Sequence, residues 1–282
     1  MKNLNKLPFT VLFMLCSLSI YAQLPEEIQW KHLAKTYNAD SSELVLSLNG
    51  KNLQGKYKIP LDEKSFALYN IKNGVITGEA FWYSNGGTLE CKLNYKNGVR
   101  NGLKENFDNS GKVWLRQNYK DGKQNGFSEM YNSDKIVSKA EYKAGKKHGL
   151  SISYSNGNVL TETYYENDLR NGPSRNYGPD GKLTIEINYK NDKRNGIYRV
   201  YNSGDLITET NYTDDLQNGL STTYSNGKKN MDANFENGKR HGASHMYKPD
   251  GTVLFESFYW QGEKVSKADF EKYWQESTKK KK

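Results

Sequence analysis

The chain has 282 residues, of which 35% are hydrophobic, and its mean hydropathy is -0.91. This apolar supply is thin for one large closed core, whereas 21 tyrosines beside 10 phenylalanines favour many half-buried ring positions. The net charge of +9 falls to +3 for residues 23–278 when six lysines near the two ends are left out. A nearly neutral body argues against nucleic-acid binding, because a phosphate-binding groove needs basic residues along its length.

Residues 1–22 form a predicted secretory signal peptide. The segment has Lys2 and Lys6 at a basic start, an apolar run up to Ile20 and the small residue Ala22. The apolar run is shorter than the roughly 20 residues that a membrane anchor needs. We therefore expect an exported chain that is cleaved near Ala22 and resides in the periplasm, the outer envelope or outside the cell.

The two cysteines indicate neither a lipid anchor nor a disulfide. Leu15, rather than a small residue, precedes Cys16, which argues against a lipoprotein. Cleavage would leave Cys91 alone, so no internal disulfide can form. Cys91 lies in an alternating, strand-like stretch, where a cysteine serves as a small apolar residue.

The segment that follows leads into a repeat array. Residues 23–42 are predicted to be partly helical or irregular, and residues 43–50 (ELVLSLNG) to form the half-hairpin that begins the sheet. The first unit, at Gly55, has Pro60 where later units have a ring. Such degeneracy is typical of a terminal repeat.

Residues 43–262 are predicted to contain about nine repeats. A glycine closes the motif YxxGxxxG, or a variant of it, every 23 or 24 residues. These closing glycines are Gly55, Gly78, Gly102, Gly126, Gly149, Gly172, Gly196, Gly219 and Gly242. A fixed period of this length is the signature of a repeat architecture.

Each unit is predicted to be one β-hairpin. A first ring follows the closing glycine by five residues in the last eight units, and a second ring comes 11 or 12 residues after the first. Turn signals such as SNGG, DNSGK and GPDGK separate the two rings. The fold class is therefore all-β, an elongated single-layer antiparallel array of eighteen strands.

The segment that joins two hairpins carries two informative positions. Its first glycine is replaced by Asp168, Asp192 and Asp215, which indicates a left-handed turn that Asp tolerates. The closing glycine never changes, so a Cβ there should clash with a neighbour or with a required backbone angle. A charged residue stands three positions before each second ring, and we expect one face of rings and aliphatic side chains and one wet face.

Residues 263–282 are predicted to form a capping helix and a lysine tail. Ser266 stands three residues before Asp269, as in a capping box. Phe270 and Trp274 lie one helical turn apart and should cover the last hairpin. A helix on a membrane surface is the alternative, with weak membrane contact, although the lysines lie beyond the helix rather than along one face of it.

The phrases YKNGVRNG, FENGKRHGASHMY and YKPDGTVLFESFY resemble the MORN repeat, and more closely the bacterial variant in the YwqK-type antitoxins of toxin-antitoxin pairs. The resemblance covers residues 55–262. It implies an elongated, slightly twisted antiparallel sheet with a groove, used mainly to bind or tether proteins and in some cases proposed to touch membranes. Combined with export, the antitoxin resemblance implies an immunity protein that acts in the envelope.

No catalytic, cofactor or metal site is predicted. The four histidines lack metal-ligand spacing. Asp214 and Asp215 fill the turn positions that Asn97 and Gly98 fill in another unit. The sequence contains no nucleophile elbow, phosphate loop or zinc motif.

The leading functional prediction is an exported, non-enzymatic scaffold that binds or tethers an unknown protein partner in the cell envelope. The alternative is a toxin-neutralising antitoxin or immunity protein. Specificity should lie where the repeats differ from one another. The candidate partner-binding residues are Trp82, Trp114, Met130, Tyr164 and Tyr198.

Overall fold

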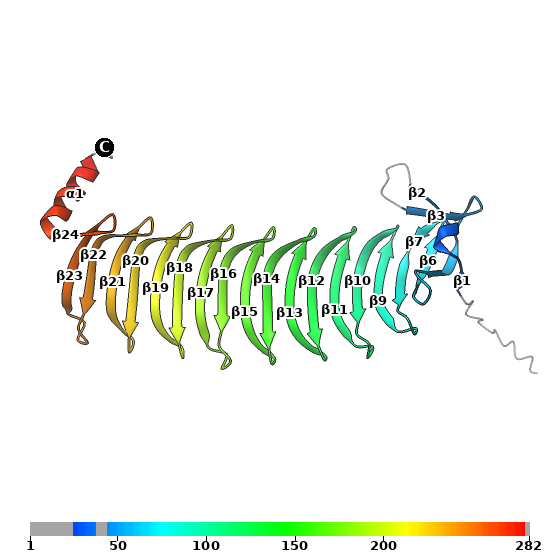
Figure 1. Ribbon diagram of the computed structural model, residues 1–282, viewed down its shortest axis with the longest axis horizontal. Coiled ribbons are helices and arrows are strands. Elements are labelled where there is room, and N and C mark those ends of the chain that lie inside the picture. Colours follow the sequence, from blue (N-terminus) through cyan, green and yellow to red (C-terminus); the bar gives the residue numbers. More distant parts are fainter. Residues whose placement is uncertain (1–24, 38–43, 280–282) are drawn as a thin grey trace, which may run out of the picture.

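The computed structural model describes residues 25–37 and 44–279 (Figure 1). The predicted signal peptide and part of the predicted N-terminal segment lie outside these residues. Figure 1 shows a long single layer of strands from β9 to β23, with one helix at the C-terminal end. The predicted all-β hairpin array with a C-terminal helix is confirmed.

The main sheet contains 21 strands, of which eighteen form nine consecutive hairpins. The hairpins are β5 (Gly55–Pro60) with β6 (Phe66–Lys72), β8 (Gly78–Tyr83) with β9 (Leu89–Lys96), β10 (Val99–Phe107) with β11 (Val113–Lys120), β12 (Lys123–Asn132) with β13 (Lys135–Lys143), β14 (Lys146–Ser155) with β15 (Asn158–Glu166), β16 (Leu169–Tyr177) with β17 (Leu183–Lys190), β18 (Lys193–Asn202) with β19 (Asp205–Thr213), β20 (Leu216–Ser225) with β21 (Lys228–Glu236), and β22 (Lys239–Tyr247) with β23 (Val253–Trp260). Three short strands complete the sheet: β1 (Glu26–Glu27), β7 (Val75–Ile76) and β24 (Glu263–Val265). All strands pair antiparallel except β1 and β5, which pair parallel.

The turn residues have the backbone angles that the sequence indicates. Asp168, Asp192 and Asp215 have φ of 72°, 67° and 71°, so the left-handed turn is confirmed. The closing Gly102 has φ of 108°, where L side chains are strained, and an added Cβ would lie 3.0 Å from the Cβ of Asn94. Backbone angle and close packing therefore both require glycine at this position.

The predicted division into one ring-bearing face and one wet face is wrong. The first rings share a face with the charged residues, since the Tyr131 hydroxyl donates to Glu129 and the Tyr177 hydroxyl to Glu162, each at 2.8 Å. The second rings lie on the opposite face, because each stands three positions after its charged residue and side chains at odd offsets along a strand point to opposite faces. We call these two faces the charged face and the hydroxyl face, after the residue rows described below.

The N-terminal end has a hydrophobic core, which the rest of the sheet lacks among the described residues. Strand β3 (Leu44–Leu48) pairs with β2 (Ala34–Tyr37) and β4 (Lys51–Asn52) in a separate three-stranded sheet, rather than beginning the array as predicted. A short 3-10 helix, η1 (Trp30–His32), precedes β2. The side chains buried between these elements and the first hairpin are Ile28, Leu33, Leu46, Leu53, Tyr57, Ile59 and Ile71.

At the C-terminal end, helix α1 (Lys267–Lys279) begins as predicted. The Ser266 hydroxyl accepts a hydrogen bond from the Asp269 backbone N–H at 3.1 Å and donates to the Asp269 carboxylate at 2.6 Å. Phe270 packs against Phe258, with ring centroids 5.4 Å apart, and against Trp260 at 6.0 Å. Helix α1 therefore contacts one end of β23 and projects beyond the sheet (Figure 1).

Candidate functional site

The five predicted partner-binding residues do not form one cluster. Trp82, Met130 and Tyr198 lie on the hydroxyl face, spread over separate hairpins. Tyr164 lies on the charged face, in the column next to Glu162. Trp114 is the extra residue of a β-bulge in β11. Its neighbours Leu115 and Val113 pair with Asn106 and Phe107, and Trp114 pairs with neither. Three of the five predicted residues therefore share a surface.

On the hydroxyl face, rows of mostly small side chains run across the strands in continuous register. One row passes through Ser128, Ala140, Ser151, Thr163, Ser174, Ile187, Tyr198, Thr210, Ser221, Ala233, Ser244 and Ser257. Hydroxyl pairs form hydrogen bonds across strands at 2.8 Å, between Thr163 and Ser174 and between Thr210 and Ser221. The short side chains leave room for a partner to approach the sheet closely.

The hydroxyl face is hollowed at strands β12 to β15. A cavity of about 240 Å³ lies there, with Ser128, Ser138 and Ser151 among its lining residues. Met130 and the second ring Tyr142 also line it. One of the predicted partner-binding residues therefore borders an actual depression in the sheet.

A cation covers several of the second rings. The pairs and their distances to the ring centroid are Arg100 with Tyr119 (4.9 Å), Lys147 with Tyr165 (5.0 Å), Arg170 with Tyr189 (4.0 Å), Arg194 with Tyr212 (4.2 Å) and Arg240 with Tyr259 (5.2 Å). Each cation comes from the first strand of the same hairpin, which precedes the strand of its ring in the chain. Such contacts are attractive because the ring face carries partial negative charge.

The aspartates that replace a turn glycine orient two of these arginines. Asp192 Oδ1 accepts from the backbone N–H of Arg170 at 2.9 Å and from its Nε at 3.0 Å, while Arg170 Nη2 donates to the Asp192 carbonyl at 3.0 Å. Asp215 holds Arg194 in the same way. The backbone and side-chain donors of Arg170 lower the pKa of Asp192. The two arginines held by aspartate lie closer to their rings than the other three cations do.

On the charged face, one row of alternating charge crosses the sheet. It runs through Lys92, Glu105, Arg116, Glu129, Lys139, Ile152, Glu162, Arg175, Glu186, Arg199, Glu209, Thr222, Asp232, His245 and Glu256. Before Ile152 the second strand of each hairpin carries the cation, and after Ile152 it carries the acid. Ion pairs link neighbours, as between Arg199 and Glu209 at 2.6 Å.

This row contributes more to strand register than to stability. Hydrogen bonding from Lys139 lowers the pKa of Glu129, and hydrogen bonding to Glu105 raises the pKa of Arg116. Exposed ion pairs of this kind contribute about 0–1 kcal/mol each. A register slip would move the charged residues away from their oppositely charged neighbours on the adjacent strands. The alternation of charge therefore opposes slippage.

The row ends in a cluster around His245. Its Nδ1 lies 2.7 Å from Asp232 Oδ1 and its Nε2 lies 3.2 Å from Glu256 Oε1, while the Tyr247 hydroxyl donates to Asp232 Oδ2 at 2.6 Å. Hydrogen bonding to Asp232 raises the pKa of His245 and raises the pKa of Tyr247 to about 12. Burial of Asp232 opposes ionisation, but the hydrogen bonds from Tyr247 and His245 outweigh it and lower the pKa of Asp232.

The histidine, aspartate and cysteine side chains that could take part in chemistry have structural roles instead. Within residues 25–37 and 44–279, no group of three or more His, Cys, Asp and Glu is placed to hold a metal ion. His241 packs against Trp260 with ring centroids 4.4 Å apart, and Asp214 is a turn residue with φ of 48°. Burial raises the pKa of Cys91, which makes the reactive thiolate rarer. None of the helices in the described part is long and apolar enough to cross a membrane.

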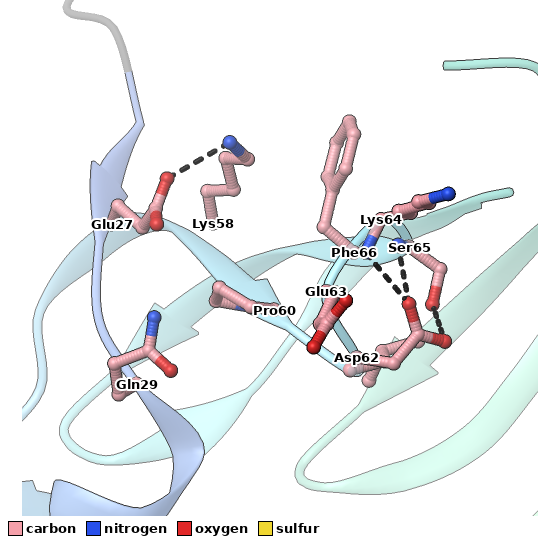
Figure 2. A pocket seen from close by; sticks show the side chains of 10 residues that line it. Glu27, Gln29, Lys58, Pro60, Asp62, Glu63, Lys64, Ser65 and Phe66 are labelled. Atoms are coloured by element: carbon pink, nitrogen blue, oxygen red, sulfur yellow. Dashed lines mark hydrogen bonds and ion pairs between the residues drawn. The ribbon is translucent and has the colours of Figure 1, made fainter. Parts of the chain in front are cut away.

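A polar cavity of about 420 Å³ lies at the N-terminal end, between β1 and the turn from β5 to β6 (Figure 2). Lys58 pairs with Glu27 at 2.8 Å on one side. On the other side the Asp62 carboxylate accepts from the backbone N–H groups of Lys64 and Ser65, each at 2.8 Å. Lys58 and Glu27 bind each other and Asp62 binds its own turn, so we assign no ligand to this cavity.

The sequence interpretation missed the hydroxyl rows and the aspartate-held arginines. Their signals were present: a Ser, Thr or Ala stands two residues after most closing glycines from Gly126 onward, and an arginine stands two residues before Gly172 and Gly196. Only strand register shows that these positions from different hairpins lie side by side.

Comparison with protein families supports the repeat type. Residues 76–97, 100–121 and 170–191 match a family model described as MORN repeat variant. No curated protein matches the chain, so the resemblance to YwqK-type antitoxins stays a prediction. Repeat arrays of this kind are typically non-catalytic and bind proteins or membranes. The three matched segments coincide with the hairpins β8–β9, β10–β11 and β16–β17.

Proposed function

We propose that this protein is an exported, non-catalytic scaffold that binds a protein partner along its hydroxyl face. The observation that carries the proposal is the continuous hydroxyl face itself, with small side chains in its floor, half-buried tyrosines and a depression at β12 to β15. An extended partner could contact several repeats at once, which adds binding energy without requiring one deep pocket.

The side chains of this face suit a protein partner. Tyr142 and Tyr165 line the depression, and tyrosine is enriched at protein interfaces because a rigid ring and a hydroxyl act together. The exposed side chain of Met130 also lines the depression, and methionine adapts to irregular apolar surfaces. Trp82 packs on Tyr69 and Tyr95 with centroids 5.7 and 6.4 Å away, so it is already held in place.

Site-specific photocrosslinking tests which face binds. A photoreactive phenylalanine analogue is placed at Met130 or Tyr198 on the hydroxyl face, and at Tyr164 on the charged face as the matched control. Met130 and Tyr164 are 44% and 38% exposed, so accessibility is nearly equal at these two sites. We expect a discrete adduct from Met130 and Tyr198 in cells that produce the protein, and none from Tyr164.

Equal adducts from both faces, or none from either, would contradict the proposal. Mass spectrometry of the adduct identifies the partner. A toxic, similarly exported partner would favour the neutralising role over tethering.

Export has its own test, because residues 1–24 lie outside the described structure. We expect the mature chain to begin near Gln23 and to fractionate with the envelope or the medium. A full-length chain that begins at Met1 and stays in the cytoplasm would show that the signal-peptide prediction is wrong.

A further inference from the structure

The last hairpin leaves part of its outer edge open. Strand β24 pairs with β23 only through Phe258, Tyr259 and Trp260. Within the described part of the chain, no strand pairs with the outer edge of residues 255–257. In every earlier hairpin from β8–β9 onward, the first strand of the next hairpin pairs with the corresponding three positions.

The side chains along this edge are apolar and exposed. Val253, Leu254 and Phe255 are 49%, 56% and 56% exposed. Helix α1 does not cover them, because it contacts Phe258 and Trp260 and then leaves the sheet (Figure 1). An edge that is unpaired and apolar is a template for pairing with another strand.

The charged row specifies what such a strand should carry. Glu256 ends the row and has His245 on its inner side at 3.2 Å. The equivalent acid of another hairpin, Glu186, has a cation on both sides, with Arg175 at 3.0 Å and Arg199 at 3.2 Å. On the outer side of Glu256, no charged partner is present within residues 44–279.

We propose that this edge of β23 docks an extended segment of another protein as an additional antiparallel strand. The segment carries a basic residue opposite Glu256 and, immediately after it, an apolar residue opposite Phe255. Strand β18 shows this arrangement against β17, where Arg199 pairs with Glu186 and Val200 with Ile185. The binding mode is β-augmentation, in which backbone hydrogen bonds supply affinity and side chains supply specificity.

A second copy of the chain fits this edge less well. Its own open strand would present Glu256 again, since residues 253–257 (VLFES) contain no basic residue. Its other edge is occupied, because β1 pairs with β5. Phe255 lies on the hydroxyl face, but docking uses the open backbone edge of β23 and Glu256 on the charged face, so it does not depend on the function proposed above.

The test is an NMR titration of the full chain with a peptide of residues 197–202 (IYRVYN), the part of β18 that reproduces the pattern. We expect shifts of the amide signals of residues 253–257 and saturable binding. The same peptide with Arg199→Glu should bind about three- to tenfold more weakly. Glu256→Arg in the protein should reverse this preference, whereas the control Glu276→Arg, in exposed helix α1, should not.

Phe255→Lys provides a second test that does not depend on charge matching, because a lysine on an edge strand opposes pairing. We expect it to abolish binding while the rest of the spectrum stays unchanged. Binding that ignores the charge of the peptide, shifts outside residues 253–257, or no saturable binding would overturn the proposal. So would a dimer in sedimentation that protects this edge.

Discussion

The two ends of the sheet are covered to different extents. At the N-terminal end, β1, η1 and a separate three-stranded sheet cover the first hairpin, and Leu46 and Ile59 are fully buried. At the C-terminal end, α1 packs beside Trp260 and leaves Phe255 more than half exposed. One end is closed by a hydrophobic core, and the other is only partly covered.

The difference shows that the repeats between the ends do not depend on a hydrophobic core. Among the described residues from 97 to 232, none of the hydrophobic side chains is buried. Neighbouring strands instead share backbone hydrogen bonds, cross-strand hydroxyl pairs such as Thr210 with Ser221, and turns with fixed backbone angles. Stability in such an array is close to a sum over adjacent repeats. A local change should therefore have local consequences.

The largest expected effect comes from emptying the N-terminal core. Leu46→Ala removes a fully buried side chain and should lower the free energy of unfolding by about 2–5 kcal/mol. Phe255→Ala, at the open end, should change it by no more than about 0.5 kcal/mol. Urea denaturation of both variants checks the contrast. Equal losses would mean that the two ends are packed alike.

The second prediction concerns the repeats between the two ends, which do not depend on a hydrophobic core. Gly102→Ala should cost about 1–3 kcal/mol, because alanine is strained at φ of 108° and its Cβ would press on Asn94. Gly111→Ala is the control, with φ of 80° and no atom within 4 Å of the added Cβ. We expect a smaller loss there in the same urea experiment. If Gly111→Ala were as costly as Gly102→Ala, close packing between repeats would contribute nothing.

The sequence predicted the array because each repeat is a local unit. The period of the closing glycines located every hairpin, and the Asp-for-Gly exchange at Asp192 identified the turn angle. Assigning both ring columns to one face was wrong, because a single-layer sheet has water on both sides and no face must be apolar. The role of residues 44–48 was also missed, since only tertiary packing shows that they close a core instead of extending the sheet.

The five candidate partner-binding residues were chosen where repeats differ, and that criterion cannot separate the two faces. Tyr164 and Met130 are both exceptional within their columns, yet they lie on opposite faces. Trp114 stands out for its size, although its position is a bulge that recurs in the hairpins. Variation along a column identifies candidates, whereas strand register decides which of them can act together.

The third prediction concerns pH at the open end. Because the pKa of His245 is raised above its usual 6.5, its protonated form stabilises the folded state below pH 6.5, and this contribution is lost as pH rises through the folded pKa. The pKa of Asp232 is lowered below 3.8, so its contribution is present above pH 3.8 and is lost as pH falls through the folded pKa.

Hydrogen exchange of amides in β22 and β23 measures this effect, with amides in β16 as the internal reference. We expect protection in β22 and β23, relative to β16, to fall above pH 6.5 in the wild-type protein and to vary less in His245→Gln. A uniform change along the whole sheet would contradict the idea that repeats respond locally.

The smallest expected effect tests the aspartate-held arginines inside the array. Asp192→Gly removes both hydrogen bonds to the carboxylate, so Arg170 should withdraw from the Tyr189 ring toward the wider spacing that Arg100 has over Tyr119. The reverse change, Gly122→Asp, should draw Arg100 onto Tyr119, because Gly122 has φ of 77° and aspartate tolerates this angle at Asp192. NMR shifts of the Arg Nε–H groups report both movements.

Since the pKa of Asp192 is lowered, the wild-type signal should persist in mild acid and approach that of Asp192→Gly only as pH falls through the folded pKa. If Gly122→Asp left Arg100 unchanged, the closer stacking at Tyr189 would have to come from another difference between the two repeats.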